Sequence, residues 1–136
     1  RLTEMDIEPF LVGSALDCVV AQRLARRLCE RCKQPGAYTH DDLRRLRFEV
    51  PDVELPPVFV PVGCPACSNT GYRGRIAVHE VMAVTEEIER LTVERASSAD
   101  IGRVAREQGM LTLREDGWEK VKRGMTSVEE ILRVVA

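Results

Sequence analysis

The spacing of hydrophobic residues predicts two kinds of element in the first part of the chain. From residue 16 to residue 28, leucine or valine recurs every four residues, and this spacing alone predicts a continuous amphipathic helix. Pro9 suits the first turn of another helix upstream. By contrast, the segment Arg75 to Val84, RIAVHEVMAV, alternates in part and is rich in β-branched residues, so it predicts a strand.

The chain after residue 85 carries the signals of four short helices. Thr85 caps the first, and Ser97 or Ser98 caps the second. The third runs from about residue 111 to 123, and Thr126 opens the fourth with a capping box in which the acidic partner lies three residues on. Four helices at this density predict a compact bundle.

Composition describes a soluble globular protein and disfavours some functions. Hydrophobic residues make up 44% of the 136 residues and charged residues 31%, which suits one domain or two small ones. The net charge of −2 disfavours nucleic acid, whose binding proteins usually present a basic face. No apolar run approaches the roughly 20 residues of a membrane-spanning helix. Cys18 stands among aliphatic residues and is predicted to be a small buried side chain.

The remaining four cysteines form two CxxC motifs. The first is Cys29-Glu30-Arg31-Cys32 and the second is Cys64-Pro65-Ala66-Cys67. Two such motifs, separated here by residues 33–63, match a four-sulfur structural zinc site held by Cys29, Cys32, Cys64 and Cys67. A tetrahedral ion with four thiolates has no open position for water, so its role is structural. Gly71 and Gly74 follow the second motif and let the backbone fold back where a Cβ would obstruct it.

Disulfides, a redox dithiol and an iron site are the alternatives to zinc for the four cysteines. Two disulfides need an oxidising compartment, and nothing in the sequence resembles a signal peptide. A redox dithiol needs only one CxxC motif. Iron fits the same spacing as zinc and stays open. Four thiolates and one divalent cation leave a charge of −2, and six flanking cations either compensate it or are ordinary surface residues: Arg26, Arg27, Arg31, Lys33, Arg73 and Arg75.

The segment between the CxxC motifs, residues 33–63, is called the insert here. Thr39 is predicted to cap a short helix over residues 41–47, with Asp42 as the partner of the capping box. Four prolines follow between residues 51 and 61, so the rest of the insert is expected to be extended and irregular. Because the insert is too short to hold a core of its own, the metal is expected to supply much of its stability.

Three stretches of the chain resemble the C-terminal part of the type II secretion and type IV pilus assembly ATPases. They are AQRLARRLCERCK, CPACSNTGYRGRIAVHEVMAV and TLREDGWEKVKRGMTSVEEILRVV. The opening stretch, RLTEMDIEPFLVGSAL, is similar to the segment after the family's histidine-bearing box. The resemblance covers essentially the whole chain and implies a hexameric motor whose RecA-like core drives pilin or pseudopilin assembly at the inner membrane.

The resemblance also changes the predicted fold. It implies that residues 21–28 form a strand preceded by a shorter helix, and that this strand pairs with the strand at residues 75–84. The fold class is then α+β: the end of a RecA-like α/β core, an inserted four-cysteine zinc module and a small helical bundle. The corresponding parts are 1–28 (end of the core), 29–74 (zinc module), 75–84 (returning core strand) and 85–136 (helical subdomain).

The chain itself is expected to be inactive as an enzyme. It contains no GxxxxGK[ST] phosphate loop, so ATP and Mg²⁺ are expected only in the parent protein. The resemblance implies neighbouring subunits of a homo-hexamer and inner-membrane platform and assembly proteins as partners. It implies a cytoplasmic location peripheral to the inner membrane, and it leaves open whether the parent serves secretion, pilus extension or DNA uptake. The alternative function is a nucleic-acid-binding zinc ribbon, which the net charge and the few aromatic residues disfavour.

Overall fold

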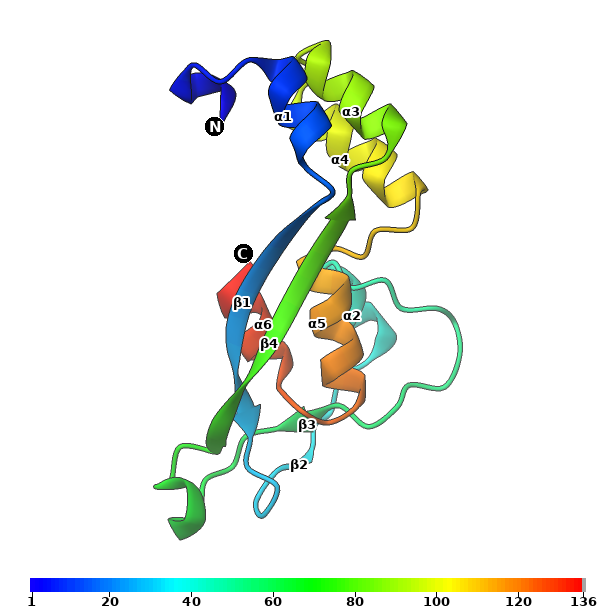
Figure 1. The fold of residues 1–136 in the computed structure, drawn as a ribbon. Coiled ribbons are helices and arrows are strands. Elements are labelled where there is room, and N and C mark those ends of the chain that lie inside the picture. Colours follow the sequence, from blue (N-terminus) through cyan, green and yellow to red (C-terminus); the bar gives the residue numbers. More distant parts are fainter. Residues whose placement is uncertain (136) are drawn as a thin grey trace. The chain divides into compact units, whose positions relative to one another are not determined.

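The computed structural model describes residues 1–135 (Figure 1). These residues form a mixed α/β fold in which most helices are short. The elements, in chain order, are η1 (Thr3–Met5), α1 (Pro9–Ala15), β1 (Cys18–Leu28), β2 (Gln34–Pro35), α2 (His40–Arg45), β3 (Phe59–Val60), η2 (Pro65–Cys67), β4 (Tyr72–Ala83), α3 (Glu86–Val93), α4 (Ser98–Glu107), α5 (Leu113–Lys122) and α6 (Val128–Val135). None of the helices over residues 1–135 has the length and hydrophobicity that crossing a bilayer requires.

The chain divides into two compact units that strands β1 and β4 both enter. Unit 1 comprises Arg1–Ala21 and Glu80–Thr112, and unit 2 comprises Gln22–His79 and the residues from Leu113 on. The four predicted C-terminal helices are present, but α3 and α4 belong to unit 1 whereas α5 and α6 belong to unit 2. The division into four parts drawn from the sequence stays a prediction.

Strands β1 and β4 pair with each other, as the resemblance implied. At one end the N–H of Val84 donates to Asp17 O over 2.9 Å, and at the other the N–H of Cys29 donates to Gly71 O over 2.9 Å. The two arrows run in opposite directions (Figure 1). The prediction of a continuous helix from the four-residue spacing was wrong, because four is also a multiple of the strand's period of two.

The burial of β1 also departs from its hydrophobic pattern. Val20 is 54% exposed and Leu24 is 47% exposed, whereas Ala25 and Leu28 are buried. Cys18 is exposed, so the prediction that it is buried was wrong. It begins β1 in a stretch, residues 17–20, whose side chains are all exposed.

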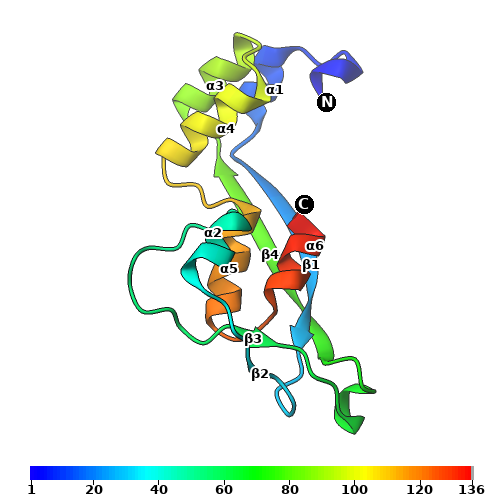
Figure 2. The ribbon, with the colours of Figure 1, turned by 180° about the vertical axis from the view of Figure 1, so that it is seen from behind.

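The core of unit 2 joins the insert to the last two helices. Phe48 of the insert and Trp118 of α5 have ring centroids 5.3 Å apart, and α2 lies beside α5 in both views of the ribbon (Figures 1 and 2). The buried members of this core are Ala25, Leu43, Phe48, Val50, Val58, Val78, Trp118, Val121, Val128 and Ile131. The insert therefore shares a core with α5 and α6. The expectation that the metal supplies much of its stability stays a prediction.

The start of α2 follows the predicted capping box. The Thr39 hydroxyl accepts the N–H of Asp42 over 3.1 Å, and the Asp42 carboxylate accepts the N–H of Thr39 over 3.0 Å. The predicted capping box at Thr126 was wrong. Ser127 accepts the N–H of Glu130 over 3.2 Å, whereas the Thr126 hydroxyl donates to Arg26 O over 2.8 Å.

Unit 1 has a small core of its own. Ile88 of α3 packs with Val104 and Ala105 of α4. Helix α1 packs on α3 through Gly13, where a Cβ would lie 2.8 Å from Cγ of Glu89. The Thr85 and Ser97 caps are confirmed, since their side chains accept the N–H groups of Ile88 and Asp100.

Candidate metal centre

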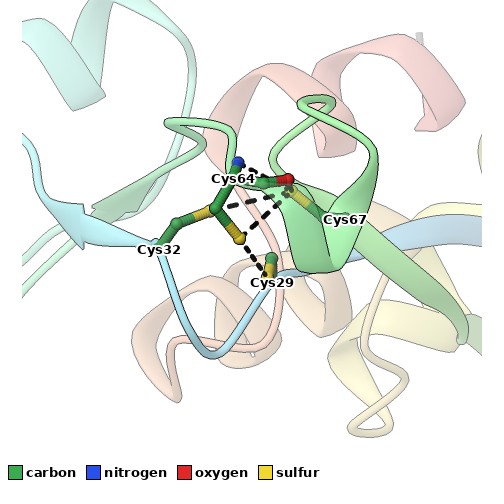
Figure 3. Close-up of side chains that lie close together, drawn as sticks. All are labelled: Cys29, Cys32, Cys64 and Cys67. Atoms are coloured by element: carbon green, nitrogen blue, oxygen red, sulfur yellow. Dashed lines mark hydrogen bonds between the residues drawn. The ribbon is translucent and has the colours of Figure 1, made fainter.

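The fold brings the sulfurs of both CxxC motifs together (Figure 3). All four Sγ atoms, of Cys29, Cys32, Cys64 and Cys67, lie within 4.8 Å of one another. Three of the separations are 3.8 Å (Cys29–Cys64), 3.9 Å (Cys32–Cys67) and 3.8 Å (Cys64–Cys67). Four ligands at a Zn–S bond length of about 2.3 Å on a regular tetrahedron stand about 3.8 Å apart. The cluster therefore has the dimensions of a four-thiolate zinc site.

The first CxxC motif forms a tight turn directly after β1. The N–H of Cys29 donates to the carbonyl of Gly71, the residue directly before β4. The N–H groups of Cys32 and Lys33 both donate to Cys29 O, over 3.3 and 3.0 Å, which bends the chain so that Cys32 returns toward Cys29. Cys29 is buried and Cys32 is partly exposed, so the site lies near the surface of unit 2.

The second CxxC motif is organised by a 3-10 turn and by glycine. The N–H of Cys67 donates to Cys64 O over 3.1 Å, and the hydroxyl of Thr70 donates to Cys67 O over 2.7 Å. Gly71 has a φ of +81°, and a Cβ there would lie 2.4 Å from Cβ of Pro61. This confirms that the glycine permits a close approach of the backbone. At Gly74 only the positive φ calls for glycine, because nothing lies within 4 Å of its Cβ position.

Backbone N–H groups point their partial positive charge at the sulfurs. The N–H of Gly63 donates to Sγ of Cys32 over 3.3 Å. Sγ of Cys67 accepts the N–H groups of Cys64 and Gly71, each over 3.2 Å. Such bonds stabilise thiolates, the form that binds metal. The sequence did not point to these donors, although glycines at turns with positive φ are a signal for exposed amides of this kind.

The thiols of the metal-free cluster have divergent pKa values. Burial opposes the charge of Cys67, but the N–H groups of Cys64 and Gly71 outweigh it and lower its pKa to about 6. The N–H of Gly63 favours the thiolate of Cys32, but burial and the neighbouring thiols raise its pKa to about 11. Metal binding must therefore displace protons, and retention of the metal weakens in acid.

Two of the six flanking cations, Lys33 and Arg26, bind groups other than the sulfurs. The ammonium of Lys33 donates to Gly124 O over 2.9 Å and lies 2.8 Å from the Glu30 carboxylate. The guanidinium of Arg26 is bound by Glu130. The structure thus shows partners for these two side chains, and the sulfurs contact backbone N–H groups and one another. Charge compensation by the flanking cations therefore stays a prediction.

A buried carboxylate, that of Glu130, joins β1 to α6. Glu130 is 1% exposed, and its Oε1 accepts the N–H of Arg26 over 2.8 Å while its Oε2 accepts Nη2 of Arg26 over 2.9 Å. It also binds the guanidinium of Arg133. Burial opposes its charge, but the bonds from Arg133 and Arg26 outweigh it and lower the pKa of Glu130 to about 2. Sequence reasoning missed this residue, because nothing local separates it from Glu129.

Comparison with known proteins shows which family the chain resembles. Residues 1–133 match the family described as type II/IV secretion system protein. The type IV pilus assembly ATPase PilB of Thermus thermophilus is 42% identical over 132 residues, which are 97% of this chain and 15% of that protein. The type II secretion system ATPase E of Vibrio cholerae is 40% identical over 134 residues, 98% of this chain and 26% of that protein.

A third relative extends the range of organisms. The type II secretion system protein HxcR of Pseudomonas aeruginosa is 40% identical over 134 residues, 98% of this chain and 24% of that protein. The chain thus spans about a quarter or less of the length of these three relatives. The match to the family over residues 1–133 and the identities of 35–42% to its curated members show that the chain belongs to the type II secretion and type IV pilus assembly ATPase family.

Proposed function

We propose that the chain is the zinc-binding and helical portion of a secretion or pilus-assembly ATPase. Zinc would be held by Cys29, Cys32, Cys64 and Cys67. The observation that carries the proposal is the sulfur cluster, whose separations near 3.8 Å fit a four-thiolate tetrahedral ion. The ion supplies rigidity and no chemistry, because its four positions are filled by protein.

The parent protein would be a homo-hexameric motor that assembles pilins or pseudopilins at the inner membrane. The ATPase names of relatives from Thermus thermophilus and Vibrio cholerae support ATP hydrolysis by that parent. The metal fixes the geometry of both CxxC motifs, so it presents the surrounding surface as a rigid contact for a neighbouring subunit or for the inner-membrane platform and assembly proteins. This portion would then work in the cytoplasm, on the periphery of the membrane.

The purified chain is expected to carry one zinc ion per molecule. Elemental analysis gives the stoichiometry, and replacement by Co²⁺ gives the absorption bands of a tetrahedral four-thiolate site. Cys18 should remain free, so thiol counting under native conditions should find one reactive thiol and four protected ones. A native chain without metal, or one whose four cysteines are joined in disulfides, would contradict the proposed centre. If elemental analysis finds iron in place of zinc, the four ligands stay as proposed and only the identity of the metal changes.

ATP turnover by the chain is expected to equal the buffer blank. Phosphoryl transfer depends on groups that position the β- and γ-phosphates and Mg²⁺, and the sequence has no phosphate loop to do so. A family ATPase that carries its phosphate loop, assayed in parallel, serves as the positive control. Magnesium-dependent hydrolysis that persists through further purification of the chain would refute the proposal that this portion is structural.

A further inference from the structure

The two CxxC motifs are supported in different ways. The second is held by bonds within its own segment, from Cys64, Thr70 and Gly71 to Cys67. The first is bracketed by bonds to a distant turn. Leu28, which precedes Cys29, donates its N–H to Met125 O over 2.9 Å, and Lys33, which follows Cys32, donates Nζ–H to Gly124 O over 2.9 Å. The carbonyls of Gly124 and Met125 thus accept hydrogen bonds from the residues on either side of the first motif.

Lys33 is fixed in this position by three contacts. Its side chain is only 16% exposed, and its ammonium lies 2.8 Å from Glu30 and 4.8 Å from the centre of the Phe59 ring. The bond to the Gly124 carbonyl is charge-assisted and therefore stronger than a neutral one. Because the N–H of Lys33 also donates to Cys29 O over 3.0 Å, a shift of Lys33 would displace the turn that orients Cys29 and Cys32.

Gly124 allows this approach because it has no side chain. Its φ is +69°, and a Cβ there would lie 3.0 Å from Cδ2 of Phe59 and 3.2 Å from Nζ of Lys33. Phe59 belongs to β3, which pairs antiparallel with β2. In this pairing Phe59 lies opposite Pro35, which follows the first CxxC motif by three residues. A methyl group at residue 124 would therefore crowd the side chains of Phe59 and Lys33, and both of these residues support the first motif.

We propose that Lys33 and the turn at Gly124 and Met125 position the first CxxC motif for metal, so that a segment 91 residues downstream of Lys33 controls how tightly the metal is retained. Lys33 acts as a positioning residue, since it touches the turn rather than the ion. The inference rests on the proposed metal-binding function. It assigns the support to one motif only, so Cys29 and Cys32 are the ligands that loosen when the support is removed.

The test is Lys33→Met in the zinc-loaded chain, with Lys33→Arg as the conservative variant. We expect Lys33→Met to release zinc to excess chelator about tenfold faster, the lower end of the effect of removing an outer contact of a metal site. Lys33→Arg keeps a cation for the Gly124 carbonyl and should release zinc at close to the wild-type rate. Lys122→Met is the matched control, because Lys122 is also a partly buried lysine of unit 2, held by Glu119 and the Trp118 ring. It should release zinc like the wild type.

Alkylation mapped by mass spectrometry separates positioning from general destabilisation. In Lys33→Met the alkylation of Cys29 and Cys32 should accelerate more than that of Cys64 and Cys67. Equal acceleration at all four cysteines, or release at the wild-type rate, would overturn the inference while leaving zinc binding intact. A wild-type chain that holds no metal would overturn the proposed function and this inference with it.

A glycine pair gives an independent test that does not alter charge. Gly124→Ala and Gly109→Ala both place alanine at a positive φ, +69° and +98°, but only the first meets neighbours, since nothing lies within 4 Å of the Gly109 Cβ position. Both should lower thermal stability, and only Gly124→Ala should accelerate zinc release and the alkylation of Cys29 and Cys32. Equal zinc release by the two variants would contradict the role of the turn.

Discussion

The Cys64→Ser/Cys67→Ser double variant is expected to lose its zinc completely and to keep α2 folded. Two thiolates cannot hold the ion that four would bind, and structural zinc binding contributes on the order of 10 kcal/mol to small zinc domains. The two CxxC motifs should then open. Helix α2 should persist, because Leu43 and Phe48 are buried against α5 and α6 rather than against the metal.

Amide hydrogen exchange measures this difference directly. In the double variant, protection should be lost over residues 29–36 and 59–71 and retained at Leu43 and in α5. Cys18→Ser is the matched control, since Cys18 is exposed and lies outside the sulfur cluster. It should keep both the zinc and the full protection pattern. Collapse of protection in α2 together with the CxxC motifs would show that the ion, and not the shared core, holds the insert.

Replacement of Glu130 by glutamine is expected to destabilise unit 2 by about 3 kcal/mol at neutral pH. Glu130 is almost fully buried, and its pKa falls from 4.5 to about 2 in the folded chain. At about 1.4 kcal/mol for each pKa unit, this depression corresponds to about 3 kcal/mol of stability. Glutamine keeps the shape but removes the charge that binds Arg26 and Arg133.

The depressed pKa of Glu130 determines how its contribution to the free energy of unfolding changes with pH. A carboxyl whose folded pKa is depressed stabilises the fold above its unfolded pKa, and this stability is lost as pH falls through the folded value. The gap in free energy of unfolding between the wild type and Glu130→Gln should therefore be full above about pH 5 and narrow toward pH 2. Urea titrations of both proteins across this range measure it. Loss of zinc in acid affects both proteins alike, so the difference between them isolates Glu130.

Glu129→Gln is the matched control for this prediction. Glu129 is the neighbouring acid of α6 and is exposed. Its loss should cost only the few tenths of a kcal/mol expected for a charge in the first turn of a helix. An equal effect of the two substitutions, or a gap for Glu130→Gln that does not change with pH, would show that the ion pairs of Glu130 do not stabilise the fold.

Local signals in the sequence predicted the ligands and several element boundaries. The CxxC spacing identified the four cysteines that the fold gathers, and Thr39 and Asp42 identified the start of α2. These signals succeed because the groups concerned lie within a few residues of each other. Local spacing was ambiguous for β1, where a repeat of four suits a helix face and a strand face equally.

Contacts between distant segments could not be predicted in the same way. The Lys33 ammonium could have met the sulfurs or any carbonyl, and only the packed fold directs it to Gly124. Thr126 and Ser127 both suit an N-cap. Which of them caps α6 depends on Arg26, whose carbonyl accepts a hydrogen bond from the Thr126 hydroxyl. The core of the insert was missed because its partners, Trp118 and Val121, lie in α5, far along the chain.

The discontinuity of unit 2 affects the order in which the protein can fold during its synthesis. Residues 22–79 emerge from the ribosome before residues 113–131, which bury Leu43 and Phe48. At 5–20 residues per second, the interval between the second CxxC motif and α6 lasts several seconds. During this time both motifs are available to metal while the apolar face of the insert has no partner. Early metal capture would therefore hold the nascent segment together until α5 and α6 arrive to cover it.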